Sequence, residues 1–486
     1  MPSRVDQLRV ASLAVCVAAA CGCAVGPDYQ APTSTVPAGW QAQPVDPAVT
    51  ANPVEERTPS YAKGLPWWRR YGDTTLGGLI EQALAQGFSV RAAAARVAAA
   101  RAQQRATASG SLPAVDVGAG ASRQENTFAG IAPEMDFSLL NAGFDARWEL
   151  DVFGRRARRE EAAAARVEAA LADQQAAQLV LAAEVARTYW QLRTSEARRR
   201  LLEDALELQK ELQALAQRRL EVGTGTRMEV LAAVAQRERV AGMLPRLNAE
   251  RTIAERQLEL LLALEPGALS ARLVEPVAPT SDDLGMLQDL LLTPAEVLAG
   301  RPDIRRAERK LAESVAMQGA AEADRYPRFS FALLMGLANT SIGSLFSAAS
   351  ESLLAGGQVV MPVFDAGRLR AAVDLSAAAV AEALVAYEQT ALAALHEVEN
   401  ALTRLGEESR RAARLDAELA ALSARVALAE QRHAGGVVDR TELLMARLEL
   451  NEAQQRRVLA GGMLRSQGVA LMKALGIGLP AAVDKS

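Results

Sequence analysis

The sequence predicts an α+β membrane protein, built as a tandem repeat of strand pairs and very long helices. Three observations support this fold class. One segment alternates between apolar and charged residues, two very long segments contain no proline, and both features occur in each half of the chain. Alternation with a period of two is typical of a strand with one apolar face, and long proline-free segments are typical of helices.

The alternating segment has the pattern expected of a membrane strand. Phe144, Trp148 and Leu150 are separated by charged or small residues, so they fall on one face. Phe329 and Phe331 begin a similar alternation in the second half of the chain. A soluble, half-buried sheet is the more common explanation of such alternation, so these strands gain meaning only from the rest of the chain.

The composition favours long, closely packed helices over a large conventional core. Half of the 486 residues are hydrophobic, but only 4% are aromatic, and much of the hydrophobic content is alanine. Alanine, with Arg, Glu and Gln, has high helix propensity. The formal net charge of −4 is too small to suggest nucleic acid as a partner.

Cysteine and histidine are too rare for a disulfide framework or a zinc site. The three cysteines, Cys16, Cys21 and Cys23, lie near the N-terminus, and the only histidines are His396 and His433. The sequence also has no phosphate-binding loop and no plausible nucleophile–base pair. We therefore expect neither an enzyme nor a metal site, and no cofactor apart from a covalent lipid.

That lipid is predicted by the N-terminus. Residues 1–22 have a basic start, a short apolar run and small residues, as an export signal does. We interpret them as a lipoprotein signal peptide, with Cys23 as the acylated first residue of the mature chain, carrying palmitate or a similar acyl group. Cys21 is a weaker candidate, an ordinary signal peptide is the alternative, and Ala20 stands where lipoprotein signals usually carry Leu. Residues 23–66 are expected to form a lipid-anchored extended tether.

The remaining chain consists of two predicted repeats. VFGRRARR at 152 returns as VFDAGRLR at 363, and the two glycines are 367 − 154 = 213 residues apart. The expected first repeat (67–264) contains a helix, a strand pair (114–152), a long helix (155–222) and a return helix (228–264) kinked at Pro245. After a linker (265–300), the second repeat (301–475) contains a helix, a strand pair (328–364), a long helix (368–434) and a return helix (440–475), followed by a tail (476–486).

Four membrane strands cannot close a barrel, and lipid does not tolerate unpaired strand edges. If these strands enter a membrane, several copies must pool them, and three copies would supply twelve strands. Alanine-rich helix faces would likewise allow a ring of helices to form a tube. A lipid-anchored periplasmic coiled-coil scaffold without a pore is the alternative.

Five motifs resemble the TolC-like outer membrane factors, in particular the lipoprotein (NodT-type) branch that serves resistance-nodulation-division (RND) efflux systems. They are CAVGPDYQAP at 23, PWWRRYGDTTLGGLIEQAL at 66, RRLEVGTG at 218, GRPDIRRAERKL at 300 and PVFDAGRLRAAV at 362. They span nearly the whole mature chain, in order.

The resemblance implies a homotrimer in the outer membrane, with a 12-stranded β-barrel continued by a periplasmic α-helical barrel. It implies a passive channel for efflux without catalysis, energised by an inner-membrane RND-type pump and coupled through a periplasmic adaptor protein. The outer-membrane duct of a type I protein secretion system shares this fold and is the alternative function.

The resemblance also assigns roles to the two helix turns, at 222–227 and 435–440, which would narrow the channel and meet the adaptor. The residues concerned are Arg219, Gly223, Gly225, Arg432 and Gly436. The glycines suit tight turns that need a positive φ angle. The arginines would bond across helices or to the adaptor, unless they are simply solvated charges.

Acidic side chains inside the second turn often form a ring in this family. Asp439 and Glu442 are the available acids here, and Glu229 is the counterpart of Glu442 in the first repeat (442 − 229 = 213). Met445 occupies the position closest to the family's usual pore aspartate, so an apolar constriction is the alternative at that position. These four residues are the candidate gate and pore residues, and solvated surface acids are the competing interpretation.

Overall fold

The computed structural model describes residues 24–32, 36–42, 66–126, 135–273 and 292–477. Cys23, the export signal and most of the tether therefore lie outside the described residues. The chain divides into two compact units. The first contains Met1–Ser34, Ala95–Leu171 and Arg306–Gln389, and the second contains Thr35–Ala94, Ala172–Arg305 and Thr390–Ser486. Each unit takes segments from both sequence repeats.

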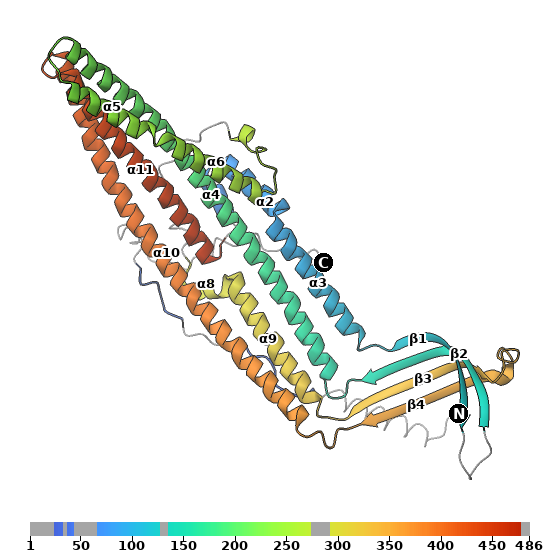
Figure 1. Cartoon of the computed structure of the whole chain (residues 1–486). Helices are drawn as coiled ribbons and strands as arrows, with labels where there is room; N and C mark the ends of the chain where they lie inside the picture. The colour runs from blue at the N-terminus through green and yellow to red at the C-terminus, as the bar shows by residue number, and fades with distance from the viewer. Residues whose placement is uncertain (1–23, 33–35, 43–65, 127–134, 274–291, 478–486) are drawn as a thin grey trace. The chain divides into compact units, whose positions relative to one another are not determined.

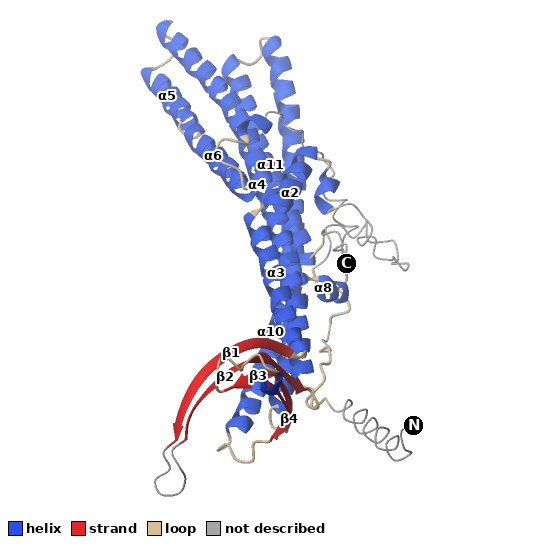
Figure 2. Ribbon diagram, turned by 90° about the vertical axis from the view of Figure 1, so that its right-hand side faces the viewer, coloured by secondary structure: helices blue, strands red, loops and turns tan. Residues whose placement is uncertain are grey.

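The first unit contains one antiparallel sheet with the strand order β1-β2-β3-β4 (Figures 1 and 2). The strands are β1 (Ala114–Asn126), β2 (Met135–Leu150), β3 (Arg328–Asn339) and β4 (Glu351–Val360). The central β2–β3 pairing joins the two repeats. In this sheet β1 and β4 are each paired on one side only.

Two strands end earlier than the sequence predicted. β2 ends at Leu150 instead of residue 152, because Asp151 turns inward and its carboxylate accepts a hydrogen bond from the backbone N–H of Ala157 at 2.7 Å. β4 ends at Val360 instead of residue 364. Pro362 follows two residues later, and its missing N–H prevents it from donating to the ladder.

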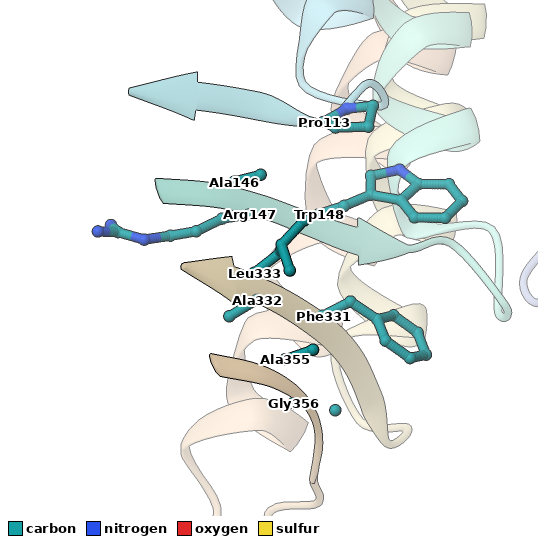
Figure 3. A pocket seen from close by; sticks show the side chains of 10 residues that line it. Pro113, Ala146, Arg147, Trp148, Phe331, Ala332, Leu333, Ala355 and Gly356 are labelled. Atoms are coloured by element: carbon teal, nitrogen blue, oxygen red, sulfur yellow. The ribbon is translucent and has the colours of Figure 1, made fainter. Parts of the chain in front are cut away.

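The register places the predicted membrane residues on one face of the sheet. Trp148 lies opposite Phe331, Leu150 opposite Phe329, and Phe144 opposite Met335, and directly opposed residues in an antiparallel pair point to the same side. In Figure 3 the rings of Trp148 and Phe331 extend to one side, whereas Arg147 extends to the other. The sheet therefore has an apolar face and a face that carries the charges of β2.

The two long helices are α4 (Arg155–Glu221) and α10 (Arg368–Ala434), of 67 residues each. Their first residues are 368 − 155 = 213 positions apart, and so are their last residues, 434 − 221 = 213. Each follows a glycine in the left-handed region, with φ of 79° at Gly154 and 88° at Gly367. The same backbone solution therefore turns a strand into a helix in both repeats.

The remaining helices are shorter. They are α2 (Thr74–Gln86), α3 (Phe88–Ser109), α5 (Arg227–Ala241), α6 (Leu244–Leu261), α8 (Pro294–Gly300), α9 (Pro302–Ala323) and α11 (Arg440–Leu475). The return helix of the first repeat is broken at Gly242 and Met243 instead of being kinked at Pro245. Pro245 lies in the first turn of α6, where its missing N–H costs nothing. Over the described ranges, no helix has both the length and the hydrophobicity to cross a bilayer.

The core of the second unit is built from aromatic and aliphatic side chains. Trp67 and Trp68, in a short 3-10 helix (Trp67–Tyr71), are each 2% exposed. The buried Asp73 caps α2 by accepting the N–H of Leu76 at 3.0 Å, and its other oxygen accepts the hydroxyl of Tyr189 at 2.5 Å. These contacts fix the helices of the unit on which the two helix turns depend.

Candidate functional site at the two helix turns

Both helix turns lie in the second unit and are built from related residues. The first turn joins α4 to α5, and the second joins α10 to α11. Gly223 and Gly436 have φ of 75° and 71°, as their positions in tight turns predicted. The two glycines are 436 − 223 = 213 residues apart, so the turns follow the sequence repeat.

The prediction of a positive φ at Gly225 was wrong, because this glycine is not among the residues with positive φ. Its backbone N–H donates to the carbonyl of Arg219 at 2.9 Å. A Cβ atom at position 225 would lie 2.8 Å from the Cβ of Arg219. Glycine is required here for the close approach of the turn to the end of α4.

Each turn is followed by an N-capped helix. Thr226 caps α5 by accepting the N–H of Glu229 at 3.3 Å, and the Glu229 carboxylate accepts the N–H of Thr226 at 3.1 Å, which completes a capping box. Asp439, the counterpart of Thr226 (439 − 226 = 213), caps α11 by accepting the N–H of Glu442 at 2.9 Å. Glu229 thus has a structural role at the helix start.

An ion pair joins the turns of the two repeats. The guanidinium of Arg219, at the end of α4, binds the carboxylate of Asp439 at the start of α11. A second pair links the same helices, with Arg440 Nη2 2.7 Å from Glu211 Oε2. Of the two bonding modes considered for Arg219, the structure shows the one across helices. Its counterpart Arg432 (432 − 219 = 213) is exposed and forms no ion pair with the residues that the structure describes.

The surroundings of Asp439 stabilise its charged form. The backbone N–H of Glu442 and the guanidinium of Arg219 lower the pKa of the Asp439 carboxyl below its usual value, against a small opposing effect of burial. Asp439 is therefore ionised at neutral pH. Its carboxylate both caps α11 and accepts the cross-helix ion pair.

Glu442 and Met445 share a different part of α11. Glu442 is exposed and Met445 is 56% exposed, and residues three apart lie on the same helix face. Leu443 and Ala446, on the opposite side, pack against Val426 and Ala429 of α10. Within the single chain, Glu442 and Met445 therefore face outward and are available to line a space shared with other copies.

Several residues at the turns escaped the sequence reasoning. Glu211 and Arg440 form a tertiary pair that leaves no local signal. Apolar side chains near the turns are also strongly exposed, a feature that the run of apolar residues beside each glycine would have indicated. They are Val222, Met228, Leu231 and Val437, at 73%, 77%, 59% and 67% exposed. Within the described part of the chain, no group of three or more His, Cys, Asp or Glu residues is placed to hold a metal ion.

Comparisons with known proteins agree with this architecture. A family model described as outer membrane efflux protein matches residues 79–264 and 293–477. The chain is 31% identical over 482 residues to the antibiotic efflux pump outer membrane protein ArpC of Pseudomonas putida, covering 96% of this chain and 95% of ArpC. The toluene efflux pump outer membrane protein TtgC of Pseudomonas putida is also 31% identical, with the same coverage.

The fold resembles solved outer membrane channels. The outer-membrane channel OprN matches with a TM-score of 0.82 and 33% identity over 94% of this chain and 99% of OprN. The open state of the Neisseria gonorrhoeae MtrE channel matches with a TM-score of 0.77 and 25% identity over 94% of this chain and 99% of MtrE. The chain therefore belongs to the outer membrane efflux protein family and has the fold of the TolC-like outer membrane channels.

Proposed function

We propose that this protein is the outer-membrane channel of a tripartite efflux pump and conducts substrates passively from the periplasm to the exterior. The likeness to ArpC and TtgC over nearly the whole chain is the observation that carries this proposal. An inner-membrane RND-type pump would supply the energy, and a periplasmic adaptor would join the two. The protein itself would need no catalytic group.

The sheet supports assembly as a homotrimer. In lipid, unpaired backbone groups at the edges of β1 and β4 would be costly, and closure with further copies removes both edges. Three copies would form a 12-stranded barrel with the face of Trp148 and Phe331 toward lipid. The test is electron microscopy of the detergent-extracted protein. We expect a threefold hollow cylinder with a detergent belt at one end, and a solid monomeric rod without a belt would refute the channel.

The resting gate would lie at the helix turns. In this proposal, the Arg219–Asp439 pair holds α11 against α4, and in a trimer Glu442 forms an acidic ring while Met445 adds an apolar constriction. A ring of acids attracts cations into a pore. The Asp439→Ala/Glu442→Ala double variant should show higher resting conductance and lower cation preference in planar bilayers. If both quantities match those of the unmodified channel, the gate lies elsewhere.

The N-terminus would carry the lipid anchor. Signal cleavage before Cys23 and acylation of its thiol would place two or more acyl chains in the membrane, enough for stable attachment. Intact-mass analysis of the mature protein provides the test. Cys23→Ser should remove the acyl mass and Cys21→Ser should keep it, whereas acyl chains on the Cys23→Ser protein would refute the assignment.

A further inference from the structure

The segment that directly follows Cys23 is bound to the first unit. The backbone N–H of Val25 donates to the carbonyl of Phe153 at 3.2 Å, beside the elbow between β2 and α4. Arg158 of α4, which is only 7% exposed, donates to the carbonyls of Val25 and Gly26 at 3.5 and 3.3 Å. The same guanidinium binds the carboxylate of Asp28 at 2.6 Å. One buried cation thus binds three successive groups of the segment.

Glycines on both sides allow this close contact. A Cβ atom at Gly26 would lie 2.5 Å from the Cα of Gly319 in α9, and Gly26 has φ of +94°. A Cβ atom at Gly319 would lie 3.0 Å from the guanidinium of Arg158. At the elbow, a Cβ atom at Gly154 would lie 2.9 Å from the side chain of Ala24. The segment is therefore packed backbone against backbone on helices that lie side by side in Figure 1.

Tyr29 closes the contact at its far end. Its hydroxyl donates to the carboxylate of Glu308 at 2.9 Å, and the guanidinium of Arg309 lies 5.3 Å from the centre of its ring. Burial and the hydrogen bond to Glu308 raise the pKa of Tyr29 to about 12, so the phenol stays a protonated donor. We call Arg158, Glu308, Arg309 and Gly319 together the N-terminal seat.

The internal repeat shows that this seat is specialised. α3 and α9 have 22 residues each and begin 302 − 88 = 214 residues apart, whereas α4 and α10 are offset by 213. The counterparts are Ala371 for Arg158, Ala94 for Glu308, Ala95 for Arg309 and Arg105 for Gly319. None of these four can repeat the contact of its partner. At the second elbow, a Cβ atom at Gly367 would have open space.

We propose that the N-terminal seat is an intramolecular binding site for residues 24–29 and fixes the acylated Cys23 beside the elbow of the first repeat. Cys23 is two residues from Val25, a distance of at most about 7 Å along the chain. The elbow carries an aromatic cluster in which Phe153 stacks on Tyr326 at 4.8 Å and lies 6.5 Å from Phe329. Aromatic rings of this kind are enriched at the boundary between lipid and water. The lipid would thus enter the membrane from a fixed point of the fold.

Hydrogen–deuterium exchange on the purified full chain tests the seat, with the peptide covering residues 24–32 as the readout. Gly26→Ala introduces the clash with Gly319 without touching any helix, and Arg158→Ala removes the clamp. We expect both to raise exchange in this peptide about tenfold, as the loss of one or two hydrogen bonds predicts, and to leave the sheet unchanged. Full exchange of this peptide in the unmodified protein at the first time point would overturn the proposal, as would unchanged exchange in both variants.

Two matched controls accompany these variants. Gly39 lies in the same tether with open space around it, so Gly39→Ala should leave the exchange of residues 24–32 unchanged. Arg159 is the neighbour of Arg158 but pairs with Asp324, so Arg159→Ala should also leave it unchanged. Only the position of the lipid rests on the proposed acylation. A protected segment without acyl mass would leave the seat in place and refute the lipid, whereas acyl mass with an unprotected segment would refute the seat.

Discussion

At the scale of single residues, the helix turns are held by capping groups and paired charges. The positive φ at Gly223 and Gly436 could be predicted, because two equivalent glycines end two equivalent helices. The partner of Arg219 could not, because Asp439 is 220 residues away and both residues are surrounded by other charges. Glu229 looked like a pore acid in the sequence, but its carboxylate serves the start of α5.

The Arg219–Asp439 pair yields a test with an internal control. Arg219→Ala removes the cross-helix bond and leaves Asp439 free to cap α11. Because both groups are substantially exposed, each lost pair should raise the ratio of open to closed channels by about two- to fivefold. Single-channel recording measures this ratio. Arg432→Ala removes the equivalent charge of the other turn and should have no effect, so equal effects of the two variants would contradict a specific role for Arg219.

The lowered pKa of Asp439 predicts a dependence on pH. A group whose pKa is lower in the folded protein stabilises that state above its unfolded pKa, and this contribution is lost as the pH falls through the folded value. Acidification below about pH 4 should therefore loosen the turns and raise resting conductance. The Asp439→Asn channel should show a smaller rise, with the remainder due to Glu211, which pairs with Arg440. An identical acid response in both channels would argue against Asp439.

At the scale of secondary-structure elements, periodicity identified the strands and long helices, but their ends followed local chemistry. The long helices could be predicted because they lack proline and follow conserved spacing within the chain. The end of β4 depends on Pro362, and the break between α5 and α6 falls at Gly242, where the sequence reasoning had chosen the nearby Pro245. The face of each strand was recoverable from alternation alone, because every second residue points the same way.

The two faces of β2 should respond differently to charge. Phe144 lies on the apolar face, opposite Met335. Arginine on the lipid face of a barrel costs about 2–4 kcal/mol near the middle of the bilayer, so Phe144→Arg should lower the midpoint of urea unfolding from lipid vesicles. Asp145→Asn changes a neighbouring residue on the charged face and should leave that midpoint nearly unchanged. Equal losses in the two variants would show that Phe144 does not face lipid.

At the scale of the whole molecule, the sequence repeat and the compact units divide the chain differently. Both repeats contribute two strands to the same sheet and one helix turn to the same tip unit. The duplicated elbows predicted two equivalent halves. The β2–β3 pairing that joins them could not be predicted, because it connects strands separated by the long helices of the first repeat. The same sheet leaves β1 and β4 at its edges, which makes its closure a property of several chains.

That closure can be tested with cysteine pairs. β1 and β4 are separated by two strands, about 14 Å at the usual spacing, whereas a disulfide needs Cα atoms within about 7 Å. A bond between cysteines on β1 and β4 must therefore join different chains. We would combine Val117→Cys with Leu353→Cys, Ala355→Cys, Gly357→Cys or Val359→Cys in turn, since all of these positions lie on the apolar face. At the correct register, oxidation should give a covalently closed trimer on denaturing gels. Val117→Cys alone should give no trimer. Monomers from all four pairs would contradict pooled strands, and a larger ladder would show a different number of copies in the barrel.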